Sequence, residues 1–260
     1  MLGMFNIDES LLMLYATSFI RIGAILFALP IFGDAPTPAR VRVFLALALS
    51  LVITPTLNSN WLIPPKSLLQ LLPIILSEIS VGLVIGFASR MLFEGIIMAA
   101  SVVGFQMGFG ASNLFIPDAG AQMNAFTATH RMLIMLMFLG LNLHHIFIAG
   151  LYESFAVVPA GAATINGDVV AVLVQLSSQI FTIGIQLAAP VLISLLFTMG
   201  ALGLMARTVP QMNVFALSFP ISFFVGMVIY IAALPFYPTW MRDQIMQSYD
   251  STLRAIAGLI

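Results

Sequence analysis

Charged side chains interrupt the long apolar segments of this chain, and they are the first residues whose types could do chemistry. Arg21 lies within SFIRIGAIL and has no acidic neighbour, so it needs a partner from elsewhere in the protein or from another chain. Arg90 and Glu94 are spaced so that they can pair on one face of a helix and neutralise each other. Glu78 lies within EISVGLVIG, where a carboxylate is costly unless it faces protein or water.

Glu78 also begins a regular spacing with Gly82 and Gly86, which places the three residues on one helical face. Glycines at this spacing allow a second helix to approach closely, which indicates ordinary helix packing. Two interpretations of Glu78 stay open. It contacts a partner subunit or lines a water-filled path, or its helix begins near the membrane interface and leaves it close to water.

Catalytic and metal-binding patterns are missing from the sequence. His130, His144 and His145 suggest a proton relay, but histidines at a helix end explain them more simply, and no carboxylate stands beside them at metal-ligand spacing. No nucleophile–base pair, glycine-rich phosphate loop or HExxH motif occurs. There are no cysteines, which excludes disulfides and thiolate sites. We therefore expect no enzyme, no cofactor and no metal.

The composition is that of a membrane protein. Of 260 residues, 61% are hydrophobic and 7% are charged, whereas soluble domains are about 45–50% apolar and about 25% charged. The chain is therefore integral to a membrane or buried among other hydrophobic subunits. A net charge of −1 gives no indication of nucleic-acid binding. The first residues include Asp8 and Glu9 and no basic residue, so no cleavable signal peptide is expected.

The apolar segments predict an all-α fold. They are continuous rather than alternating, which favours helices over a barrel, and about six could span a bilayer. Pro73 and Pro190 are candidate kinks in the two longest segments, each of which fits two short helices or one bent one. A modestly amphipathic helix is expected over 239–260. The apolar segments cover about 11–33, 43–57, 68–109, 131–151, 169–205 and 214–238.

Two breaks between these segments stand out. GFQMGFGASNLFIPDAGAQMN, residues 104–124, is flexible, apolar and nearly uncharged. RTVPQMN, residues 207–213, is short, and we expect Pro210 to end one helix and Asn213 to cap the next. Arg207 and Gln211 complete this second break, for which a contact with neighbouring subunits or a constriction near a cytoplasmic entrance is an alternative role.

With these two breaks the chain resembles the FliR family, subunits of the flagellar export gate with a counterpart in the injectisome. The resemblance covers nearly the whole chain. It includes the early stretch RIGAILFALPIFGDAPTPARVR, the spacing Glu78-x3-Gly82-x3-Gly86-Phe87, and GFQMGF at 104–109. The most specific match is Arg207-x2-Pro210-Gln211-Met212-Asn213-Val214-Phe215, followed by Phe219-Pro220 and Gly226.

The resemblance implies a single FliR-type unit over 1–260 that is built into a helical hetero-oligomeric gate with FliP and FliQ. Residues about 1–165 would be similar to FliP and about 166–260 to FliQ. FlhA and FlhB would be further partners, membrane lipid would surround the assembly, and unfolded export substrates would pass through its centre. The implied location is the bacterial inner membrane and the flagellar basal body, with parts of the subunit above the bilayer plane.

The resemblance also implies that the glycine-rich loop enters the pore and helps to plug it. Phenylalanines would act as apolar stoppers, methionines would conform to varied surfaces, and glycines would let the backbone move aside. The alternative is a re-entrant loop that only packs between helices. The expected plug residues are Gly104, Phe105, Gln106, Met107, Gly108, Phe109, Gly110, Phe115 and Pro117.

Other functions remain open at this point. The chain could serve the injectisome rather than the flagellum. It could be an autonomous small-solute transporter whose site includes Glu78, Arg21 and the glycine-rich loop, although no convincing internal repeat is found. A purely structural membrane scaffold would have no need for a glycine-rich, uncharged central loop.

Overall fold

The computed structural model describes residues 9–29, 37–57, 67–110, 124–163, 168–209, 211 and 213–258. Every regular element within these ranges is helical, which confirms the predicted all-α class. The α-helices are α1 (Glu9–Ala28), α3 (Ala39–Ile53), α4 (Leu68–Gln106), α6 (Ala125–Gly140), α7 (His144–Val157), α8 (Asp168–Thr208), α9 (Val214–Ala233) and α10 (Tyr237–Ala257). Short 3-10 helices lie at η1 (Thr54–Thr56) and η4 (Leu234–Phe236).

The apolar helices agree with the expected number of spans. Five stretches of the described chain are long and apolar enough to cross a membrane, and α6 with α7 would make a sixth if this broken pair counts as one. The apolar segment expected over 131–151 corresponds to this pair, and a short break separates α6 from α7. Asn142 adopts a left-handed backbone with φ 56° at this break, a conformation that asparagine tolerates better than most residues.

The two longest apolar segments form one helix each. α4 has 39 residues and α8 has 41, with Pro73 and Pro190 in their interiors. A helix of 40 residues is about 60 Å long, whereas the hydrocarbon core of a bilayer is about 30 Å thick. Each helix is therefore long enough to extend well beyond the hydrocarbon core.

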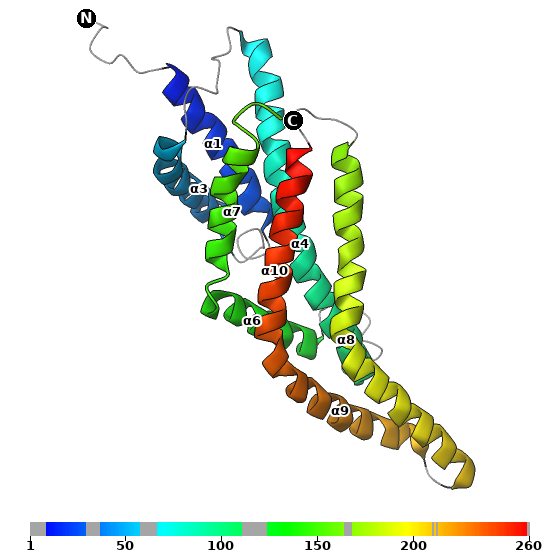
Figure 1. The fold of residues 1–260 in the computed structure, drawn as a ribbon. Coiled ribbons are helices and arrows are strands. Elements are labelled where there is room, and N and C mark those ends of the chain that lie inside the picture. The colour runs from blue at the N-terminus through cyan, green and yellow to red at the C-terminus, as the bar shows by residue number, and fades with distance from the viewer. Residues whose placement is uncertain are drawn as a thin grey trace, which may run out of the picture. The chain divides into compact units, whose positions relative to one another are not determined.

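The chain divides into two compact units that each combine distant segments. The first unit comprises Met1–Met91, Asn142–Ser177 and Ile245–Ile260. In it α1 and α3 lie side by side (Figure 1). One core cluster of this unit joins α1, α3 and α7 and consists of Ile22, Ile25, Leu26, Leu29, Ala46, Ile53, Leu151 and Phe155.

The glycine face of α4 packs closely against α1, as its spacing predicts. A Cβ atom on Gly82 would lie 2.6 Å from Ala24 Cβ and 2.7 Å from the Arg21 carbonyl oxygen. A Cβ atom on Gly86 would collide with Ala28. The two backbones can therefore approach at this spacing only because α4 has no side chains there.

The second unit comprises Leu92–Leu141 and Ser178–Gln244. Here α9 runs back beside the end of α8, to which a short turn connects it (Figure 1). The core joins the end of α4, the start of α6 and the middle of α8, and partly buried residues of α9 pack against it. Its buried members are Ala99, Ala100, Val103, Met107, Phe126, Ala188, Val191 and Leu195.

Candidate functional site

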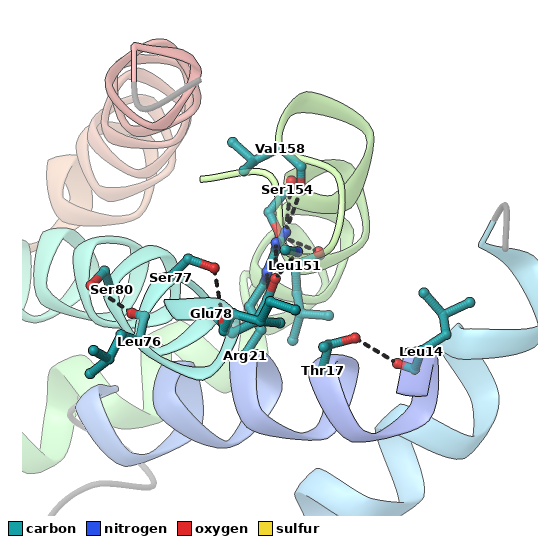
Figure 2. A network of polar contacts seen from close by, with 12 residues as sticks. Leu14, Thr17, Arg21, Leu76, Ser77, Glu78, Ser80, Leu151, Ser154 and Val158 are labelled. Carbon is teal, nitrogen blue, oxygen red and sulfur yellow. Dashed lines mark hydrogen bonds and ion pairs between the residues drawn. The ribbon is translucent and has the colours of Figure 1, made fainter. Parts of the chain in front are cut away.

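Arg21 and Glu78 form a fully buried ion pair in the first unit (Figure 2). Arg21 Nε donates to Glu78 Oε2 at 2.6 Å, and Arg21 Nη2 donates to Oε1 at 3.0 Å. Both side chains are 0% exposed. This two-pronged geometry is the strong form of an arginine–carboxylate contact, and it joins α1 to α4.

The same two side chains also bind the backbone at the end of α7. Arg21 Nη1 donates to the carbonyl oxygens of Ser154 at 3.0 Å and Val158 at 2.8 Å. The Gly161 N–H donates to Glu78 Oε1 at 2.6 Å, and the Phe155 ring lies 4.2 Å from the guanidinium carbon. The Ser154 carbonyl also accepts the Val158 N–H at 2.9 Å, whereas Val158 follows the last residue of α7. Arg21 therefore holds the end of α7 while it neutralises Glu78.

This arrangement supplies the partner that Arg21 requires from elsewhere in the protein. Glu78 is not close to water, as one interpretation of its position suggests. Its carboxylate is bound within the chain by Arg21 and the Gly161 N–H. Gly82 and Gly86 continue the same face of α4, so close packing of α1 brings the two charges together.

Arg90 and Glu94 lie one helical turn apart on α4, and both are half-buried. Their spacing still predicts a pair on one face of the helix.

The glycine-rich loop begins from a fixed base in the second unit. α4 ends at Gln106, and the Gly108 and Phe109 N–H groups donate back to the Phe105 and Gly104 carbonyl oxygens, each at 3.0 Å. We call the segment Gly104–Gly110 the loop base. A Cβ atom on Gly104 would lie 2.9 Å from Asn124 Oδ1, so the chain returns from the loop where it left α4.

Asn124 secures the returning end of the loop. Its Oδ1 accepts hydrogen bonds from the Thr127 N–H at 2.8 Å and the Thr127 hydroxyl at 2.9 Å, which caps the start of α6. An asparagine is among the preferred residues for this position because its oxygen binds a free N–H of the first turn. The loop therefore leaves α4 and enters α6 at neighbouring points.

The predicted plug residues of the loop base face different surroundings. Phe105 is 68% exposed, whereas Met107 is 2% exposed and fills the space beside Gly226. Gly108 has φ 94°, and a Cβ atom there would lie 2.7 Å from the Phe219 ring. Phe115 and Pro117 lie outside the described residues.

A cavity of about 630 Å³ opens beside the loop base. The Gln106 amide lies at its wall and donates to Met199 Sδ at 3.9 Å. Its lining is mostly apolar, with Ser218 and Ser222 from α9 as further polar members. The lining residues are Phe105, Gln106, Gly108, Gly110, Met199, Leu202, Gly203, Val214, Ser218, Phe219 and Ser222.

An aromatic cluster behind the loop base is a feature that the sequence does not reveal. The Phe109 ring lies 5.6 Å from the rings of both Phe126 and Phe223. Phe126 stacks on His130 at 6.2 Å, and His130 Nδ1 is 2.7 Å from the Tyr230 hydroxyl. The interpretation of the histidines as helix-end residues fits His144 and His145, which begin α7, but His130 is buried within α6.

The second break forms the turn between α8 and α9. Arg207 lies in the last turn of α8, and Arg207, Gln211 and Asn213 are exposed. Asn213 Oδ1 accepts from the Ala216 N–H at 3.1 Å, which confirms the predicted cap of α9. Pro210 lies outside the described residues. A subunit contact at this turn remains a prediction.

Comparison with known proteins defines the class of this helical membrane protein. Residues 12–248 match the family described as bacterial export proteins, family 1. The chain is 32% identical to the flagellar biosynthetic protein FliR of Escherichia coli (strain K12), over 87% of this chain and 86% of the relative. It is also 32% identical to FliR of Bacillus subtilis (strain 168), over 93% of both chains, and 30% identical to FliR of Caulobacter vibrioides, over 82% and 84%.

The chain belongs to this export family and, within it, to the FliR proteins. The family match, over residues 12–248, includes the Arg21–Glu78 network and the loop base. The resemblance inferred from the residues is therefore confirmed at the level of the family.

Proposed function

We propose that this chain is a subunit of the flagellar type III protein export gate, where its glycine-rich loop lines and plugs the pore. Its place among flagellar export components rests on the family and on relatives that are named for flagellar biosynthesis. Unfolded proteins would pass through this gate out of the cytoplasm, and the gate would block ions when no protein is passing. Sealing and passage need no catalytic residue.

The observation that supports the plug is the closed base of the loop. Gly104 touches Asn124, and both the end of α4 and the start of α6 are held by backbone and capping hydrogen bonds. A loop whose two ends are anchored together can change conformation without disturbing the helices that carry it. Its composition supplies apolar side chains that disfavour water and glycines that ease backbone movement.

The anchored part of the loop also refines the roles of individual residues. Phe105 is exposed and suits the part of an apolar stopper. Met107 and Phe109 pack into the second unit and suit the part of anchors instead. A loop that only packs between helices would account for the packing of Met107 and Phe109. It would not account for the exposure of Phe105.

The remaining parts of the proposal concern the assembly. FliP and FliQ would cover the exposed apolar side chains of this subunit, with FlhA and FlhB as further partners. The location would be the inner membrane at the flagellar basal body. A solute transporter with a site at Arg21 and Glu78 is disfavoured, because each side chain already binds the other and nearby backbone groups. The names of the relatives favour the flagellar machine over the injectisome.

The test is an ion-leak measurement on the assembled gate. The chain is co-expressed with its operon neighbours, purified as a hetero-complex and placed in liposomes. Deleting residues 106–120 should raise ion conductance severalfold while native mass shows an intact complex. In a second variant, a Gly-Ser linker of equal length replaces residues 106–120, so that the chain keeps its length but loses the loop's side chains. This variant should leak as well. Unchanged conductance in both variants would rule out the plug.

A further inference from the structure

Phe126 is the side chain that connects the loop base to the interior of the second unit. We propose that Phe126 holds Phe109 in place, and that the hydrogen bond between His130 and Tyr230 positions Phe126. His130 and Tyr230 are thus positioning residues for the loop. The proposal rests on the proposed function, since it concerns how the plug is kept closed, but one of its tests does not depend on that function.

Phe126 has contacts on both sides of this connection. It is buried, and its ring lies 5.6 Å from Phe109 and 4.9 Å edge-on from Tyr230. A Cβ atom on Gly104 would lie 3.1 Å from the Phe126 ring, so this ring also packs against the last turn of α4. A shift of Phe126 therefore removes support from two points of the loop base.

The His130–Tyr230 contact fixes Phe126 from behind. His130 stacks on Phe126 from the next turn of α6, with an angle of 21° between the two rings. The imidazole is bound to the Tyr230 hydroxyl at 2.7 Å, which ties α6 to α9. Because Tyr230 also packs edge-on against Phe126, the hydrogen bond holds both rings that surround it.

The chain offers a closely matched control at Tyr237. Its ring packs edge-on against the same imidazole, with centroids 5.5 Å apart, and lies 6.5 Å from the Tyr230 ring. The hydrogen bond to His130 Nδ1 comes from Tyr230. Tyr230→Phe and Tyr237→Phe each remove one phenol oxygen from neighbouring rings. Only Tyr230→Phe removes the hydrogen bond to His130.

The first readout is chemical labelling, which the sequence makes specific. The chain has no cysteine, so one introduced thiol is the only site in this subunit. Ser222→Cys is close to isosteric, and Ser222 is 2% exposed in the cavity that Gly108 and Gly110 also line. In the assembled gate, Tyr230→Phe should raise the maleimide labelling rate of this thiol roughly tenfold, the upper range for one net hydrogen bond. Tyr237→Phe should leave the rate unchanged.

A double-mutant cycle separates the hydrogen bond from general loosening. With His130→Phe already present, adding Tyr230→Phe should raise the labelling rate no further, because the bond is already lost. Additive increases would overturn the proposal. If His130→Phe does not assemble, the comparison of Tyr230→Phe with Tyr237→Phe decides alone.

Ion conductance relates this result to the plug. If the deletion of 106–120 leaks and Tyr230→Phe also leaks, positioning of the plug is supported. If the deletion leaks while Tyr230→Phe and Tyr237→Phe behave alike in both assays, the positioning role fails and the proposed function stands. If the deletion does not leak, the plug fails, and labelling still shows whether the bond holds the loop base.

Discussion

The guanidinium of Arg21 and the carboxylate of Glu78 meet through two hydrogen bonds with no exposure to solvent. Neither charge is stable in this position without the other, since an unpaired buried charge is far more costly than a pair. The contact also reaches the end of α7, so one arginine connects three helices of the first unit (Figure 2). Its removal should therefore affect the whole unit rather than one helix.

Breaking this pair from one side should be strongly destabilising. Arg21→Met leaves the Glu78 carboxylate buried without its counter-charge, with an expected loss of about 3–5 kcal/mol in the free energy of unfolding. Thermal unfolding of the detergent-solubilised chain measures it. Arg242→Met, at an exposed position of α10, is the control. The double variant Arg21→Met/Glu78→Met should recover much of the loss, and equal instability of single and double variants would contradict the pair's role.

Adding a single methyl group to the glycine face of α4 should separate it from α1. Gly86→Ala places a Cβ atom against Ala28, and overpacking of this kind costs about 1–3 kcal/mol. Gly23→Ala on α1 is the matched control, because its Cβ atom would meet nothing within 4 Å. That control should be neutral or stabilising by up to about 1 kcal/mol through helix propensity. Similar melting temperatures for the two variants would argue against close packing here.

The left-handed backbone at Gly108 should make this position intolerant of side chains. Gly108→Ala combines an unfavourable φ with a contact at 2.7 Å to the Phe219 ring, so the loop base should loosen. Limited proteolysis of the assembled gate should then cut near residues 105–110 more rapidly. Gly203→Ala, which lines the same cavity with open space around it, should leave the cleavage rate unchanged.

Capping by asparagine should contribute a similar free energy at the N-terminal ends of α6 and α9. Asn124→Ala and Asn213→Ala each remove an oxygen that binds a first-turn N–H, at an expected cost of about 1 kcal/mol. Hydrogen exchange should quicken in the first turn of α6 for the one variant and of α9 for the other. Asn→Ser, which keeps a capping oxygen, should restore slow exchange, and failure to do so would assign the effect to packing.

The sequence predicts those features whose cause is local. Hydropathy locates the apolar helices, the spacing of Gly82 and Gly86 indicates a close contact, and Asn213 after a proline indicates a cap. The break at Asn142 is missed because a single asparagine between leucines hardly changes the hydropathy of its surroundings.

The partners of Arg21 and His130 could not be inferred in this way. Glu78 lies 57 residues after Arg21, and Tyr230 lies 100 residues after His130. No periodicity relates such positions, and they meet only because helices pack on one another. A lone arginine and a lone glutamate in separate apolar segments are nevertheless a usable signal, since each requires a buried partner.

The network around Arg21 also bears on how the protein is made. Glu78 is synthesised 57 residues after Arg21, and Val158 is synthesised 137 residues after Arg21. At roughly 5–20 residues per second, the last of these partners is translated about 7–27 s after the arginine. During that interval the first helix carries a charge that the lipid interior disfavours. The network can therefore close only after α7 has been translated, so α1 and α4 depend on a later part of the chain for the burial of their two charges.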